Sequence, residues 1–272
     1  MKPPTYRVID QNYLREPNEP LHRYLSAGNF VVLTDYAGME SHKGSALLNL
    51  RRSLEIVSKY PAQTVVLKNW YQICRITQRG SKHLRRLLID SKTTDMFGQF
   101  CKQTYTLDDS VPSPALAELE RKNREANQFF VDKVPYAQMV LDAIKMYNGA
   151  FPPEQLKLIR LGRYLDDEQL LSRMMNHIVM VASRMMRKNG YIVRRAAHAK
   201  NNYMFRWALA GYLLSMKWLS EGGYENLPIP KLQNDIIDMA YVAYATYFDG
   251  LLSNDNKMNE IYLLTKAFLG PS

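Results

Sequence analysis

Cysteine is scarce in this 272-residue chain. Its two cysteines, Cys74 and Cys101, form no CxxC pair and no cluster with histidine, so neither a disulfide framework nor a zinc site is expected. The opening residues, "MKPPTYRVID", also lack an apolar stretch of signal-peptide length. Both absences favour a protein of the reducing cytoplasm.

Long hydrophobic runs are missing as well. The most apolar long segment, residues 203–219, is interrupted by Arg206 and Lys217. It therefore falls short of the roughly 20 uninterrupted apolar residues that a membrane span needs. We expect a buried helix there and no membrane partner.

Acidic residues are the minority among the charged side chains. The chain has 36 Lys and Arg against 26 Asp and Glu, which gives a formal net charge of +10. Such a balance favours a polyanionic partner through counterion release, with nucleic acid ahead of an anionic membrane surface. Many basic proteins bind no polyanion, however, and net charge does not bear on the fold.

Four short segments have the composition of buried strands. Each is rich in Val, Ile or Leu and apolar without alternation, which is typical of strands covered on both faces of a parallel sheet. The segments are residues 6–10, 29–34, 63–68 and 250–254. They predict an α/β fold with a central, mainly parallel sheet.

The middle of the chain has a helical pattern. Between residues 69 and 230, apolar residues recur at a spacing of three to four, and prolines in "VPYAQ" and "AFPPEQ" mark helix starts. The strongest such segments are residues 115–130, 136–147 and 170–186. Residues 221–233, "EGGYENLPIPKLQ", are expected to form a loop. The predicted organisation is an α/β core of residues 1–68 and 231–272, with a predominantly helical insertion at 69–230.

Acidic residues follow the predicted strands. Asp10 comes after the first strand, Glu40 lies just after the second and Asp255 follows the fourth, while Asp235 and Asp238 share one face of the preceding helix. Because parallel sheets bind ligands at the carboxyl ends of their strands, we expect these acids to converge. Clustered carboxylates repel one another unless a cation neutralises them. They therefore predict bound Mg²⁺ or Mn²⁺, which can activate water for phosphodiester hydrolysis.

Each of these acids also has a purely structural interpretation. Asp235 fits a helix N-cap, the more common role for an isolated residue of this kind. Asp35 is expected to cap the helix after the second strand, and Asp249 to serve a turn. Asp10 and Asp255, taken singly, are also more often caps at strand ends than metal ligands.

The order of three motifs resembles the PIN-domain nucleases. The motifs are "VIDQN", "FVVLTDYAGME" and, near the C-terminus, "NDIIDMAYVAYATYFDGLLSND". That family has a strand ending in Asp-x-Asn, a Glu on the helix after the second strand, and an Asp followed by a helix, a short strand and Ser/Thr-x-Asp. Asp10, Glu40, Asp238 and Asp255 match its four acids in order. Asp235 also suits the third position, but the spacing from Asp238 to Asp255 is closer to the family's.

The resemblance implies a three-layer fold, although the family's pattern does not cover the helical insertion. It implies metal-dependent endonucleolytic cleavage, usually of RNA, with Mg²⁺ or Mn²⁺ in an acidic pocket. The implied catalytic and metal-binding residues are Asp10, Glu40, Asp238 and Asp255, with Asp235 as a further candidate metal ligand. Asn12 and Ser253 are implied to support these ligands through hydrogen bonds.

A basic segment at residues 184–206 is the first candidate for substrate binding. It has seven Lys and Arg, no acid, and the aromatic residues Tyr191, His198 and Tyr203 between the cations. Aromatic rings among cations suit single-stranded or looped RNA. The candidate contacts are Arg187, Lys188, Arg194, Arg195 and Lys200. A solvated helix face whose aromatics serve the core explains the pattern equally well.

A second basic segment, residues 68–92, has seven Lys and Arg and one acid around a turn at Gly80. Lys43, three residues after Glu40, is a candidate contact for the scissile phosphate, although a surface lysine is the commoner role.

Two further hypotheses remain open from the sequence. A non-catalytic RNA-binding or protein-interaction module could use the same scaffold, and a structure-specific DNA nuclease could use the same acids. Methionines concentrate in residues 172–186, where they suit adaptable core packing or a homodimer interface.

Overall fold

The computed structural model describes residues 2–16, 19–42, 46–76, 83–108, 111–131, 146, 149–188, 190, 196–222 and 228–270. The chain divides into two compact units. The sheet unit comprises Met1–Ile73, His83–Asp132 and Tyr244–Asn259. The helical unit comprises Cys74–Lys82, Lys133–Ala243 and Glu260–Ser272.

The sheet unit is built on four parallel strands in the order β3-β2-β1-β4. The strands are β1 (Tyr6–Ile9), β2 (Phe30–Leu33), β3 (Thr64–Val66) and β4 (Gly250–Leu252). Val8 lies beside Val32 on one side and Leu251 on the other. All four predicted strands and the predicted parallel α/β sheet are confirmed, because continuous apolar runs suit strands buried on both faces.

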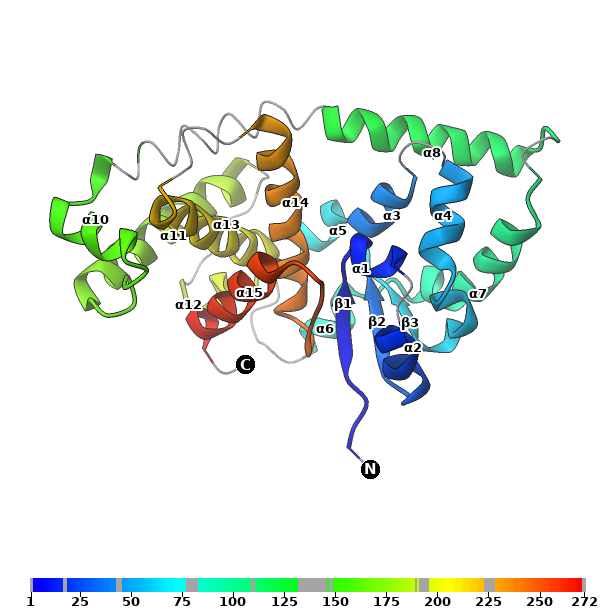
Figure 1. The fold of residues 1–272 in the computed structure, drawn as a ribbon, viewed down its shortest axis with the longest axis horizontal. Helices are drawn as coiled ribbons and strands as arrows, with labels where there is room; N and C mark the ends of the chain where they lie inside the picture. Colours follow the sequence, from blue (N-terminus) through cyan, green and yellow to red (C-terminus); the bar gives the residue numbers. More distant parts are fainter. Residues whose placement is uncertain are drawn as a thin grey trace. The chain divides into compact units, whose positions relative to one another are not determined.

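Helices pack around these strands (Figure 1). In chain order they are α1 (Gln11–Arg15), α2 (Glu19–Ser26), α3 (Asp35–Ser41), α4 (Ala46–Leu54), the 3₁₀ turns η1 (Val57–Lys59) and η2 (Pro61–Gln63), α5 (Trp70–Cys74), α6 (Leu84–Leu88), α7 (Ser91–Thr106) and α8 (Pro114–Val131). One buried cluster joins strand residues such as Ile9 and Val31 to Leu25 of α2, Leu50 of α4 and Phe97 of α7. The helices thereby cover apolar strand residues that would otherwise face water.

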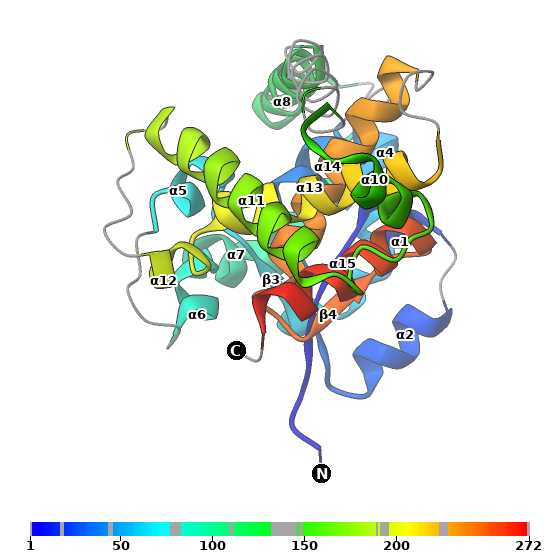
Figure 2. The ribbon, with the colours of Figure 1, turned by 90° about the vertical axis from the view of Figure 1, so that its left-hand side faces the viewer.

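The helical unit is centred on α13 (Tyr203–Ser220). Its other helices are α10 (Pro153–Arg160), α11 (Glu168–Lys188), α12 (Ala196–Ala199), most of α14 (Ile229–Ala245) and most of α15 (Asn256–Leu269). Both α10 and α11 pack on α13 (Figure 2), which is buried around most of its circumference. The predicted buried helix at 203–219 is therefore confirmed. No helix in the described ranges is long and apolar enough to cross a membrane.

Other predicted helices have mixed outcomes. The segments at 115–130 and 170–186 form α8 and α11, and Pro153 begins α10 as expected. The segment at 136–147 lies outside the described residues except for Met146. The predicted loop at 221–233 is partly wrong, because α14 already begins at Ile229. Its flanking prolines suit a helix start, where a missing N–H removes no helical hydrogen bond.

The unit boundaries differ from the expected division at residues 68 and 231. Helix α7 packs on β3 and α4, and α8 packs on α3 and α4, so both belong with the sheet.

The methionines of α11 differ in exposure: Met174 and Met186 are buried, whereas Met180 is 47% exposed. Packing in the core accounts for the first two. A homodimer stays a prediction.

Candidate functional site

The sheet has a topological switch point between β1 and β4. The chain passes from β1 to β2 and then β3 on one side, and β4 pairs with the other side of β1. Ligands in open parallel sheets bind at such a point, beyond the carboxyl ends of the strands. We call the edge of the sheet at which the four strands end the carboxyl edge. Asp10 follows β1 directly and Ser253 follows β4 directly, and the Asp10 N–H donates to the Leu252 carbonyl at 3.1 Å.

Asp10 is a buried carboxylate, with only 5% of its surface exposed. It caps α1, accepting a hydrogen bond from the Tyr13 N–H at 2.6 Å. Burial raises the pKa of Asp10, hydrogen bonds from Ser253, Tyr13 and Asn12 oppose this, and the charge of Asp255 raises the pKa further. The two acids therefore lie within electrostatic reach of each other at the switch point.

Asp255 plays the same local role for α15. Its carboxylate accepts from the Met258 N–H at 3.0 Å, and its own N–H donates to the Ser253 hydroxyl at 3.0 Å. Ser253 thus connects Asp10 with Asp255. Both acids therefore cap helices, and the neighbouring strands β1 and β4 place them at the same edge of the sheet.

The predicted support from Asn12 has a different origin. Its side chain is exposed, and its contact with Asp10 is made by the backbone N–H. A backbone amide at the start of α1 supplies this contact whatever the side chain.

Glu40 lies on α3, as expected, and is half-buried. Its carbonyl accepts from the Arg15 guanidinium at 2.8 Å, which ties α3 to α1. The expected cap of this helix is wrong: Thr34 is the N-cap, and its hydroxyl accepts from the Ala37 N–H at 3.1 Å. Asp35 is the first helical residue, because the short Thr34 side chain already satisfies the amide of the first turn.

Asp35 connects three parts of the sheet unit. One carboxylate oxygen accepts from the Trp70 N–H at 2.8 Å and the other from the Tyr244 hydroxyl at 3.2 Å. Asp249 lies at the opposite edge of the sheet, where it accepts from the Tyr6 N–H and from Arg85, each at 2.7 Å. Asp249 thus has a structural role, as predicted, and this role includes contacts with β1 and α6 as well as the turn before β4.

A buried polar network connects the helices next to these acids. It was not predicted from the sequence. Gln11, Ser41 and Ser53 are each at most 3% exposed. With the Gln11 amide in the orientation that satisfies both of its ends, it donates to the Ala37 carbonyl and accepts from Ser53 and from Arg15. The network joins α1, α3 and α4. The signal in the sequence that could have predicted this network is the polar residue Gln11 directly after Asp10.

The third acid lies in the helical unit. Asp235 and Asp238 are both on α14, where Asp235 is 3% exposed and Asp238 is half-buried. The N-cap interpretation of Asp235 is wrong, because α14 starts six residues earlier in the chain, at Ile229. Their participation with Asp10 stays a prediction.

The donors that the sheet unit brings together suit a hard cation. Within the described ranges, no three side chains of His, Cys, Asp or Glu gather closely enough to hold a metal ion. Mg²⁺, however, usually binds through one or two carboxylates and completes its shell with water and substrate phosphate. The carboxylates of Asp10 and Asp255 are a donor set of this chemistry.

The predicted substrate contacts are only partly described. Lys43, Arg194 and Arg195 lie outside the described residues, as does Tyr191. Arg187 and Lys200 are exposed, and Lys188 is the last residue of α11.

The stacking role of Tyr203 is wrong. Its ring is 3% exposed within α13, so it cannot receive a base. Arg206 is also buried and donates to the Lys200 carbonyl at 2.8 Å. The structural interpretation holds for these two residues, because α13 is covered by its neighbours.

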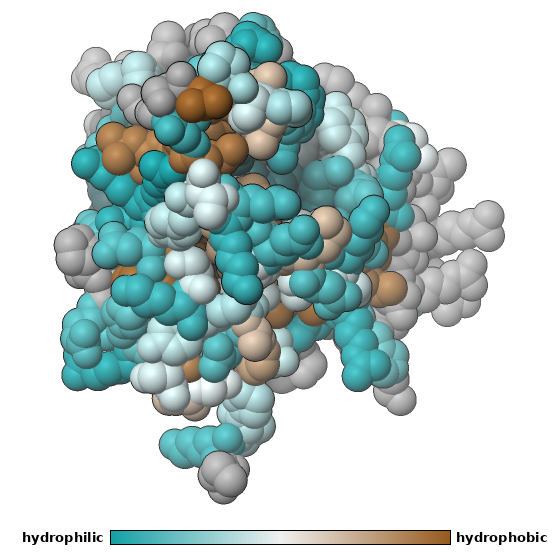
Figure 3. Space-filling model, turned by 90° about the vertical axis from the view of Figure 1, so that its right-hand side faces the viewer, coloured by the Kyte–Doolittle hydropathy of each residue, from teal (hydrophilic) through white to brown (hydrophobic). Residues whose placement is uncertain are grey.

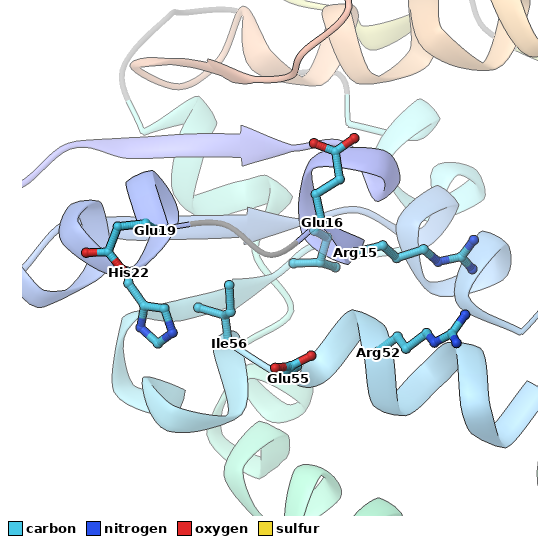
Figure 4. Close-up of a pocket in the computed structure, with 8 residues that line it drawn as sticks. Arg15, Glu16, Glu19, His22, Arg52, Glu55 and Ile56 are labelled. Carbon is cyan, nitrogen blue, oxygen red and sulfur yellow. The ribbon is translucent and has the colours of Figure 1, made fainter.

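A pocket of about 310 Å³ lies beside α1 and α4 (Figure 4). Arg15 and Arg52 extend toward the same side of it, while Glu16 points away and accepts from Asn254 at 2.5 Å. Glu19 and Glu55 also line it. None of the predicted acids lines this mixed-charge pocket.

The surface of the face drawn in Figure 3 is mostly hydrophilic, and apolar residues appear there in small, separate groups. Scattered apolar residues of this kind are normal on a protein surface.

Comparisons of the chain with protein-family models, with curated proteins and with solved structures found no match.

Proposed function

We propose that the chain is a metal-dependent endoribonuclease whose reacting phosphodiester binds over the carboxyl ends of β1 and β4. The observation that supports this most is the pair of carboxylates, Asp10 and Asp255, at the switch point of a parallel sheet. The net charge of +10 suits a polyanionic substrate.

In this proposal Asp10 and Asp255 hold the metal, and the hydrogen bonds from Ser253 and the Tyr13 N–H fix the direction of the Asp10 carboxylate. Bound Mg²⁺ or Mn²⁺ would screen the phosphate charge and lower the pKa of a coordinated water. Glu40 would accept a hydrogen bond from the attacking water, and its helix is held by the contact of Arg15 with the Glu40 carbonyl. By the PIN resemblance Asp238 supplies the third acid, with Asp235 as the alternative.

Removal of either paired carboxylate tests the proposal. We expect Asp10→Asn and Asp255→Asn each to reduce RNA cleavage on the order of 100-fold or more, because ligand geometry controls metal binding. Asn keeps the capping hydrogen bond, so the fold is retained. The matched control is Asp90→Asn, since Asp90 caps α7 in the same way through the Thr93 N–H. Unchanged cleavage in both test variants refutes the proposal.

Metal binding has a readout that is independent of activity. Mg²⁺ or Mn²⁺ should raise the thermal midpoint of the wild-type protein and of Asp90→Asn, but not that of Asp10→Asn, because a ligand stabilises the folded state that binds it. EDTA should abolish cleavage.

The same assays separate the rival functions. A gel shift of RNA without fragments, with or without Mg²⁺, indicates a non-catalytic binding module. Cleavage of structured DNA in preference to RNA indicates a DNA nuclease, since metal-bound carboxylates do not read the 2′-hydroxyl.

A further inference from the structure

Two aromatic side chains follow β3 at the carboxyl edge. Tyr71 is 60% exposed, and its ring centroid lies 4.1 Å from that of the half-buried Trp70. Because β2 lies between β3 and β1, strand spacing puts the ends of β3 and β1 roughly 10 Å apart. The aromatic pair therefore shares the edge that carries Asp10.

The pair is held in place at the start of α5. The Asn69 side chain accepts from the Gln72 N–H at 3.0 Å, and the Gln72 side chain accepts from the Asn69 N–H at 3.2 Å. This reciprocal pair is a capping box, which fixes the first turn of a helix. The Trp70 N–H donates to Asp35 at 2.8 Å. The backbone that carries the rings is thus fixed before any ligand binds, which lowers the entropy lost on binding.

Positive charge lies along the chain on either side of the pair. Lys68 is two residues before Trp70, but it is half-buried and its ammonium group donates to the Leu87 carbonyl of α6 at 2.8 Å. Arg86 of α6 is exposed. With the net charge of +10 to attract a polyanion, an exposed pair of rings suits a nucleic acid whose unpaired bases stack on them.

We propose that Trp70 and Tyr71 form a stacking platform for an unpaired base of a single-stranded RNA bound along the carboxyl edge. This rests on the proposed function and adds to it the single-stranded character of the substrate. A duplex keeps its bases stacked inside and offers none to the platform. The acids would then act on a strand whose flanking base is held on Tyr71.

The experiment measures binding without cleavage. The full chain in EDTA is titrated into a labelled single-stranded oligoadenylate and into an RNA duplex of equal length, and fluorescence anisotropy is followed. The variants are Tyr71→Ala, Tyr71→Phe and the control Tyr105→Ala, an exposed tyrosine on α7 of the same unit.

We expect Tyr71→Ala to weaken single-strand binding about 5- to 150-fold. Tyr71→Phe keeps the ring and should bind within about twofold of the wild type. The slope of log K against log salt should not change in Tyr71→Ala, because no charge is lost. Duplex affinity should be the same in all variants.

An unchanged affinity in Tyr71→Ala overturns the platform, and so does a loss in Tyr71→Phe equal to that in Tyr71→Ala. The first result leaves the ring without a role in RNA binding, and the second assigns the contact to the Tyr71 hydroxyl instead of the ring. Binding that depends on Tyr71, with no cleavage under any metal, supports the platform and refutes the nuclease. Cleavage with binding that ignores Tyr71 does the reverse.

Discussion

The carboxylate of Asp10 is buried although it can carry a negative charge. Asp10 caps α1 and lies within electrostatic reach of Asp255. Only 5% of its surface is exposed, so its negative charge is poorly solvated. Burial raises the pKa of Asp10 above its ordinary value of 3.8. Between that value and the folded pKa, the folded state holds a proton that the unfolded state has lost. Stability therefore falls as pH rises through this window, and the deficit is complete above the folded pKa.

Replacement of this charge should stabilise the metal-free protein. We expect Asp10→Asn in EDTA to have a higher thermal midpoint than the wild type at neutral pH, because Asn caps a helix as well as Asp does. The difference should shrink on acidification and vanish below pH 3.8, where both states of the wild type are protonated. Thermal melts across pH measure it. A midpoint for Asp10→Asn below that of the wild type at neutral pH contradicts the expectation.

At the scale of elements, the contact of α1 with α3 and α4 decides where the acids lie. Gln11, Ser41 and Ser53 form a buried network there, and Arg15 adds the bond to the Glu40 carbonyl. Buried polar networks specify one arrangement when they are fully satisfied. The positions of Asp10 and Glu40 depend on this network.

The network can be tested with one substitution. Gln11→Leu should lower the free energy of unfolding by about 1–3 kcal/mol, because it leaves buried partners unsatisfied. It should also reduce cleavage. The control is Gln103→Leu, the same change at an exposed position of α7, for which we expect a change within about 0.5 kcal/mol. Urea denaturation compares the two, and equal effects would argue against the network.

Local sequence accounted for most elements but not for their ends. The four strands were predictable because unbroken apolar runs have few other uses in an α/β protein. The start of α14 at Ile229 was predicted as part of a loop, because proline is common both in loops and at helix starts. The cap of α3 was assigned to Asp35 instead of Thr34, since adjacent capping residues compete and only the backbone geometry decides between them.

At the scale of the whole molecule, a net charge of +10 acts over distance on any polyanion. The exposed cations Arg187 and Lys200 of the helical unit are available for this role. Arg121 of α8 differs, because it forms ion pairs with Glu118 and Glu125. Exposed cations and cations held in ion pairs should therefore contribute differently to nucleic-acid binding.

This difference is measurable as salt dependence. If Arg187 and Lys200 contact phosphates, each change to Ala should reduce the slope of log K against log salt by about 0.7 for single-stranded RNA. Arg121→Ala should leave the slope unchanged. A slope unaffected by the first two variants would remove this surface from the binding site.

The sequence by itself determined the strands, the parallel sheet and the buried helix at α13, because these follow from patterns of neighbouring residues. It also marked Asp10 and Asp255 as candidates. Only the tertiary structure decided that these two acids converge while capping their helices, that Ser253 joins them, and that Tyr203 is buried while Tyr71 is exposed. Those properties depend on which strands become neighbours and which helices cover each side chain, and contacts between residues distant in the chain determine both.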